Sequence, residues 1–101
     1  MSDKYKLNGH AVERCDDLME WARWFETADT QVARDGVGDA KVSTFFLGLD
    51  YSFGVGSPLL FETSIMGGSH DGDMARCGTW EEAERQHKDM IAALNKEAAD
   101  E

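Results

Sequence analysis

The sequence predicts an α+β fold: a three- to four-stranded antiparallel sheet with an N-terminal helix at about 17–29 and a C-terminal helix at about 80–96 packed on it. Apolar residues recur at helical spacing in the two outer segments, whereas between them they alternate between two faces. Glycine-containing turns separate the alternating segments. The length predicts a single domain over residues 1–101, with a short N-terminal arm at 1–14 and a frayed acidic tail at 97–101.

Two hairpins are predicted. Asn8-Gly9 lies between two short β-capable pieces and is a strong two-residue turn signal, although so few residues flank it that we expect a marginal hairpin or an ordered arm. Further along, we expect Gln31–Arg34 as an incoming strand, Asp35–Gly38 as the turn and Ala40–Tyr51 as a long outgoing strand.

Both helices begin with a capping signal. Asp17 with Glu20, and Thr79 with Glu82, have the spacing of a capping box, with Asp17 in place of Ser or Thr. Behind each cap, apolar side chains repeat along one stripe of the helix and are expected to pack in the core. The residues for which we expect core packing include Trp21, Phe25 and His87.

The strands carry a pleated pattern. In the long strand both faces are apolar in the middle, which is typical of a strand covered on both sides or of one with a face left for a partner, and Phe46 carries that ambiguity. Pro58 opens the next alternating strand, in which Leu59, Phe61, Thr63 and Ile65 share a face. Met74–Gly78 is expected to form a short edge strand.

The charge balance restricts the partners. Ten basic and 20 acidic residues give a net charge of −10, which disfavours nucleic acid and anionic membranes and would steer the chain toward a basic protein. The N-terminal residues lack the apolar stretch of a signal peptide, and no apolar run approaches the ~20 residues of a membrane span, so a cytoplasmic location is expected. Cys15 and Cys77 are expected to be free thiols.

The loop Gly54–Pro58 does not match a phosphate cradle. Gly54-Val55-Gly56 begins like a dinucleotide fingerprint, but the third glycine would fall at Leu59. A phosphate cradle also needs a helix N-terminus behind it, whereas Pro58 leads into a strand. We therefore interpret the loop as a connection between strands.

Metal and nucleophile patterns are also incomplete. Asp71, Asp73 and Glu82 occupy positions 1, 3 and 12 of a calcium loop, but Ala75 and Arg76 stand where an oxygen ligand and glycine are required. The candidate zinc ligands match no finger spacing; they are His70, Asp71, Cys77 and His87. There is no G-x-S-x-G elbow. We expect no metal, no cofactor and no catalytic residue.

One enzymatic alternative stays open. Asp50 and Glu62 flank the glycine loop, and two carboxylates beside an aromatic wall would suit acid/base chemistry or a small ligand. Asp50 next to a turn is, however, more often a residue that caps the turn, and Glu62 would equally suit a solvated face.

The stretches "VSTFFLGLDYSFG…SPLLFETSIMGG" and "TWEEAERQH", with "WARWFET" upstream, resemble a group of small proteins encoded by bacteriophages and prophages. The resemblance covers roughly residues 18 to 90. The chain departs from it at Tyr51, where the group has histidine, and at Ser57, where it has a second proline. It implies a phage gene product acting in the cytoplasm of a bacterial host, and no catalytic residue carries over.

The expected function is therefore stoichiometric binding. By analogy with small acidic phage proteins, we expect inhibition of a host anti-phage defence, for example a CRISPR-type complex, through its basic surface. A homodimer is compatible with this, with Phe46 or the second face of the long strand as the interface. The candidate partner-binding residues are Trp24, Asp50, Tyr51, Phe53, Glu62, Asp71 and Asp73.

Overall fold

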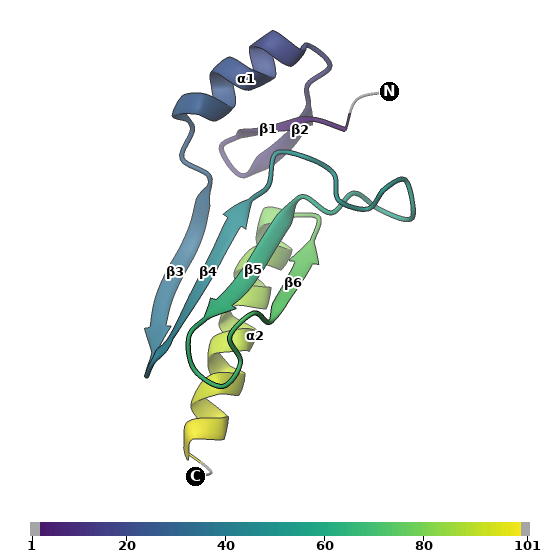
Figure 1. Ribbon diagram of the computed structural model, residues 1–101. Helices are drawn as coiled ribbons and strands as arrows, with labels where there is room; N and C mark the ends of the chain where they lie inside the picture. Colours follow the sequence, from purple (N-terminus) through teal and green to yellow (C-terminus); the bar gives the residue numbers. More distant parts are fainter. Residues whose placement is uncertain (1–2, 100–101) are drawn as a thin grey trace.

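The computed structural model describes residues 3–99 and confirms the α+β class (Figure 1). The elements are β1 (Tyr5–Asn8), β2 (Ala11–Arg14), α1 (Leu18–Thr27), β3 (Gln31–Val37), β4 (Ala40–Phe46), β5 (Phe61–Met66), β6 (Met74–Cys77) and α2 (Trp80–Ala99). β3, β4, β5 and β6 form an antiparallel sheet in that order, and β1 and β2 form a separate two-stranded sheet.

The N-terminal arm is an ordered hairpin, but its turn is not where we predicted it. Asn8 pairs with Ala11, so the two turn residues are Gly9 and His10 rather than Asn8-Gly9. Gly9 has φ +64°, a left-handed conformation that glycine adopts at little cost. Residues 1 and 2 of the predicted arm lie outside the described residues.

The helix α1 is shorter than predicted and lies on the hairpin more than on the sheet. Asp17 Oδ1 accepts the N–H groups of Met19 and Glu20 at 2.9 and 3.1 Å, as a capping residue should. The reciprocal half of the capping box is absent, because the Glu20 carboxylate instead accepts from Lys6 Nζ at 2.8 Å and from the Cys15 thiol at 3.3 Å. This carboxylate therefore joins α1 to the hairpin.

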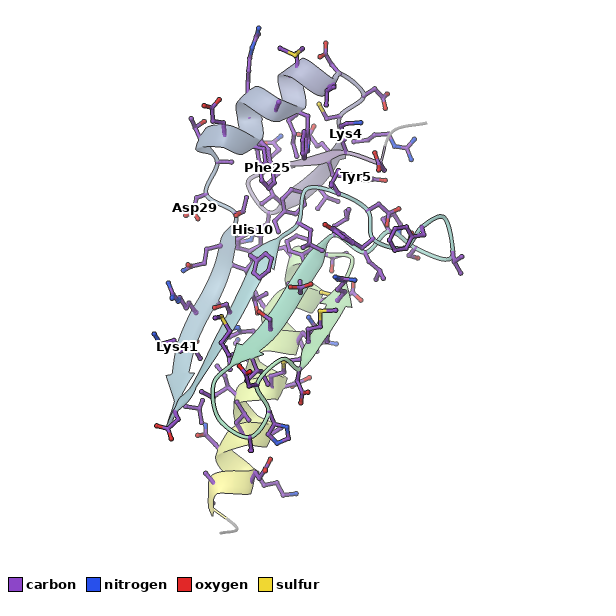
Figure 2. All side chains as sticks on the ribbon, viewed as in Figure 1. Lys4, Tyr5, His10, Phe25, Asp29 and Lys41 are labelled. Carbon is purple, nitrogen blue, oxygen red and sulfur yellow. The ribbon has the colours of Figure 1, made fainter. Side chains whose placement is uncertain are left out.

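The core role predicted for Trp21 and Phe25 is wrong, because α1 has no buried residue. Trp21 is half-buried, and its Nε1–H lies 3.1 Å from the carbonyl oxygens of both Tyr5 and Gly48. The exposed Phe25 ring lies against Gly48, at the junction of α1, the hairpin and the end of β4 (Figure 2). The helix is held by a polar anchor and ring contacts at this junction.

The β3–β4 hairpin also differs from the prediction. β3 continues through the predicted turn to Val37, which pairs with Ala40, so Gly38 and Asp39 form the turn. Gly38 has φ +58°, whereas Gly36 adopts no positive φ and stays in the strand. β4 ends at Phe46 rather than at Tyr51.

One face of the sheet is covered by α2, which lies behind the four strands in Figure 1. The residues that β4 and β5 bury on this face are Ala40, Val42, Thr44, Phe46, Phe61, Thr63 and Ile65. This confirms the predicted face of β5 for Phe61, Thr63 and Ile65, whereas Leu59 lies before the strand, which begins at Phe61. It also excludes Phe46 as a dimer interface, since only 1% of its surface is exposed.

The helix α2 begins as predicted and extends further. Thr79 Oγ1 accepts the N–H of Glu82 at 3.1 Å, which caps the first turn. Ala83 and His87 are buried, and Met90, Ile91 and Leu94 pack on a second apolar cluster formed by Ala40, Val42 and Ile65. The helix continues to Ala99, so residues 97–99 of the predicted frayed tail are helical, while 100 and 101 lie outside the described residues. Within residues 3–99, no helix is long and apolar enough to cross a membrane.

Candidate partner-binding site

The loop between β4 and β5 is closed at its base by Asp50. Its Oδ1 accepts the N–H groups of Ser52 and Leu59 at 2.8 and 3.0 Å, and the Tyr51 N–H donates to the Leu59 carbonyl at 3.0 Å. These backbone donors, Leu59 first and then Ser52, hold the pKa of the Asp50 carboxyl below its ordinary value. The turn-capping interpretation of Asp50 is thus confirmed.

The tip of this loop presents two large apolar side chains to solvent. Phe53 is 85% exposed and Val55 is 80% exposed. Phe53 also has φ +54°, a left-handed conformation that is costly for a residue with a Cβ, and Gly54 and Gly56 on either side of Val55 are left-handed as well. In Figure 1 this loop projects away from the sheet. The loop therefore has a hydrogen-bonded base and an exposed apolar tip.

An aromatic and charged row connects the loop with the open face of the sheet. The Phe53 ring lies edge-on to Tyr51, with 6.3 Å between centroids. The Arg76 guanidinium lies over the Tyr51 ring at 4.6 Å, and its Nη2 forms an ion pair with Glu62 Oε1 at 3.0 Å. Glu62 pairs across the sheet with Phe45 of β4. Tyr51, Phe53 and Glu62 are therefore brought together, as a partner surface would require.

The other predicted partner residues lie elsewhere. Trp24 is half-buried and packs edge-on against Phe46, with 5.8 Å between centroids, on the face of the sheet that carries the core. Asp71 and Asp73 lie in the turn at the opposite end of β5. The seven predicted residues therefore do not form one surface.

The β5–β6 turn has its own bracing. Asp71 Oδ1 accepts the Gly67 N–H at 2.7 Å. His70 contacts two carboxylates, with Nε2 2.6 Å from Glu97 Oε2 and Nδ1 3.0 Å from Asp73 Oδ2. The bond to Glu97 first, and the one to Asp73 second, raise the pKa of His70 above its ordinary value. This clasp ties the turn to the end of α2.

A chain of hydrogen-bonded side chains lies between the sheet and α2. Gln86 Nε2 donates to Thr63 Oγ1 at 2.9 Å, and Thr63 and Thr44 hydroxyls lie 2.7 Å apart. His87 lies 2.7 Å from Thr44 at Nδ1 and 2.7 Å from Asp35 Oδ2 at Nε2. Since an amide NH₂ only donates and a carboxylate only accepts, Gln86 is the donor at one end of the chain and Asp35 is the acceptor at the other. It resembles a triad, but the Thr44 hydroxyl is fully buried, so it satisfies core polar groups.

The cysteines are thiols, as expected. Burial first, and the nearby Glu82 carboxylate second, raise the pKa of Cys77 to about 11, so its reactive thiolate is scarce at neutral pH. Burial and the bond to Glu20 raise the pKa of the Cys15 thiol. Among residues 3–99, no three His, Cys, Asp or Glu side chains are grouped so that they would hold a metal ion.

Arg76 and Val55 belong to the candidate site, and sequence reasoning missed both. Arg76 reaches Tyr51 and Glu62 only through the β5–β6 register, in which it pairs with Glu62. That register depends on the length and shape of the turn between the strands, which no local pattern gives. Val55 lies between two left-handed glycines, and no periodic pattern in the loop indicates that it is exposed.

Comparison of the chain with protein-family models, with curated proteins and with solved structures finds no match.

Proposed function

We propose that this chain is a stoichiometric protein-binding module of the phage type, and that the loop of residues 50–59 is its principal contact. The observation that carries the proposal is Phe53, an aromatic side chain 85% exposed on a left-handed backbone. This conformation costs about 1–2 kcal/mol for a residue with a Cβ, and the exposed ring gains little burial energy in return. A loop braced to hold such a side chain outward fits a contact residue.

The loop has the properties of an interface hot spot. Asp50 fixes its base with two backbone hydrogen bonds, so little conformational freedom is lost when a partner covers the tip. Phe53 and Val55 supply apolar area, and the adjacent Tyr51–Arg76 stack supplies the residue types enriched in hot spots. An apolar pocket on the partner would complement this tip.

The acidic charge favours a basic partner because it attracts that partner over a distance, and not because it forms ion pairs at the loop of residues 50–59. Glu62 is already paired with Arg76, and Asp50 is engaged by backbone donors. The remaining net charge of −10 acts over a longer range, and salt weakens it. Together with the resemblance to phage proteins, this supports inhibition of a host defence complex with a basic surface, in the cytoplasm of a bacterial host.

The small-molecule or enzyme alternative at Asp50 and Glu62 has less support. The two carboxylates make separate contacts, one with the backbone of its own loop and the other with Arg76 on the sheet. A general acid/base pair needs both groups directed at one reacting centre. The same geometry is what a structural brace and a surface ion pair require.

The proposal is tested by capture from a lysate of a host that carries an active nucleic-acid-guided defence. Tagged wild type, Phe53→Ala and Met66→Ala are compared at low and high salt. Met66 is the matched control, because it is also a large apolar side chain with 64% exposure, but it lies at the other end of β5. Light scattering of the free chain tests the homodimer through the open sheet face.

We expect one stoichiometric complex with wild type and Met66→Ala, lost on Phe53→Ala and weakened by salt. The captured complex should lose its target cleavage when the chain is added in equimolar amount, because the inhibitor acts by occupancy. Equal capture by Phe53→Ala would overturn the role of the loop. Capture without any effect on cleavage would overturn the inhibitor role.

A further inference from the structure

The strand β3 is an edge of the four-stranded sheet, and one side of its backbone has no partner strand among residues 3–99. The Leu47 N–H donates to the Leu60 carbonyl, so odd-numbered positions along β4 bond toward β5. Even-numbered positions such as Val42 consequently bond toward β3. The alternation leaves the N–H and C=O groups of Arg34 and Gly36 directed away from the sheet.

A groove lies beside this edge, between β3 and α2. It has a volume of about 360 Å³, and its lining includes Ala33, Asp35, Glu84, Lys88, Ile91 and Ala92. Small and aliphatic side chains line it from both elements, while two carboxylates and one ammonium group supply its charges. The groove is thus apolar with a negative balance, beside a strand edge with free hydrogen-bonding groups.

Asp35 is held in position at this groove. Its Oδ2 accepts from His87 Nε2 at 2.7 Å, and His87 is anchored in turn by Thr44. The Asp35 side chain nevertheless stays 57% exposed. A carboxylate that is oriented by a buried partner and still open to solvent is well placed to receive a cation from a bound segment.

We propose that β3 and this groove bind an extended, basic segment of a partner protein by strand addition. The backbone of the segment pairs with Arg34 and Gly36. On the side of the segment that faces α2, an aliphatic side chain enters the groove over Ile91, and a Lys or Arg two residues away meets Asp35 and Glu84. Strand periodicity makes these two positions neighbours on one face.

A second copy of the chain fits this edge poorly. β3 runs from Gln31 to Val37, so an antiparallel overlap along its whole length with a second β3 places Arg34 opposite Arg34. Like charges directly opposite each other destabilise a strand pair. The register shift between Gln31 and Ala33 shortens the regular edge further. A basic strand from another protein meets the same shortened edge, but its register can place a Lys or Arg beside Asp35 and not opposite Arg34.

The inference rests on the proposed binding function for its biological role, but its test needs no captured partner. The probe is the labelled peptide Thr-Val-Thr-Lys-Thr-Val-Thr, measured against the full chain by fluorescence anisotropy and by amide NMR. One control peptide carries Glu in place of Lys, and another is N-methylated at alternate residues, so that it keeps its side chains and loses its donors. The protein variants are Glu84→Lys and its matched control Asp89→Lys, which makes the same charge change on the other side of α2.

We expect saturable binding of the Lys peptide, with amide shifts concentrated at Arg34 and Gly36. Glu84→Lys should weaken it about tenfold or more, and Asp89→Lys less than about twofold. The Glu and N-methylated peptides should not bind. Absence of saturable binding below about 1 mM, or equal binding of the N-methylated peptide, overturns the inference. Either outcome leaves the effect of Phe53→Ala on partner capture unchanged, so the two proposals fail separately.

Discussion

The two loops at the ends of β5 use the same brace for different purposes. Each contains left-handed glycines, and in each an aspartate accepts from the backbone: Asp50 accepts two N–H groups and Asp71 accepts one. The loop of residues 50–59 then exposes Phe53, whereas the β5–β6 turn folds back and fastens His70 to α2. The first loop therefore keeps an exposed apolar tip on a hydrogen-bonded base, which fits the contact surface that we propose, and the second is closed against α2.

The largest expected effect on stability comes from removing the Asp50 brace. Asp50→Ala leaves two N–H groups without their acceptor, and bonds to a charged group contribute about 1.5–3 kcal/mol each, so the variant should lose about 3–6 kcal/mol of unfolding free energy. Urea denaturation measures this loss. Asp50→Asn keeps one oxygen acceptor and should lose clearly less; an equal loss in both variants would show that the charge rather than the acceptor matters.

The next effect is at Gly48, where the chain leaves β4 toward the loop. Its φ is +77°, and an added Cβ would meet the Phe25 ring at 2.5 Å. Backbone strain and the displaced ring together should lower the unfolding free energy of Gly48→Ala by roughly 2–4 kcal/mol. Gly54→Ala is the control, since Gly54 has φ +80° and open space around it, and it should lose about 1–2 kcal/mol. Equal losses would mean that the ring contact contributes nothing.

A smaller effect is expected when the second brace is removed. Asp71 accepts one backbone N–H in an exposed turn, so Asp71→Ala should lose about 1 kcal/mol, well below the loss from Asp50→Ala. Thermal denaturation of the two variants side by side measures the difference. If Asp71→Ala lost as much unfolding free energy as Asp50→Ala, the two aspartates would stabilise their loops equally, and the difference between the two loops would not hold.

The smallest effect is the pH dependence of the His70 clasp. The contacts with Glu97 and Asp73 raise the pKa of His70 in the folded state above its ordinary 6.5. The stabilisation is therefore fully present below about 6.5 and is lost as the pH rises through the raised folded-state pKa. The difference in melting temperature between wild type and His70→Gln should shrink over that range. A constant difference across it would contradict the ion-pair account of the clasp.

The helices and the buried strand faces could be predicted because the signals are local. Caps at Asp17 and Thr79 and the alternation along β5 were enough, and a core-facing His87 was expected from its stripe. Turn positions were less predictable, since two glycines compete in Asp35–Gly38 and only the tertiary hairpin selects Gly38. Within the candidate site, the sequence predicts Phe53 as a partner-binding residue. The position of Arg76 beside Glu62 could not be predicted, because it depends on the strand register.

Phe53→Gly tests most directly whether the loop is less stable because it holds a contact residue exposed. Glycine adopts φ +54° without strain, so the unfolding free energy should stay unchanged or rise by up to about 1 kcal/mol. The affinity for the captured partner should fall at least about thirtyfold, which is the effect expected when a hot-spot residue is removed. A variant that keeps its affinity, or one that unfolds more easily by over about 2 kcal/mol, would contradict the account.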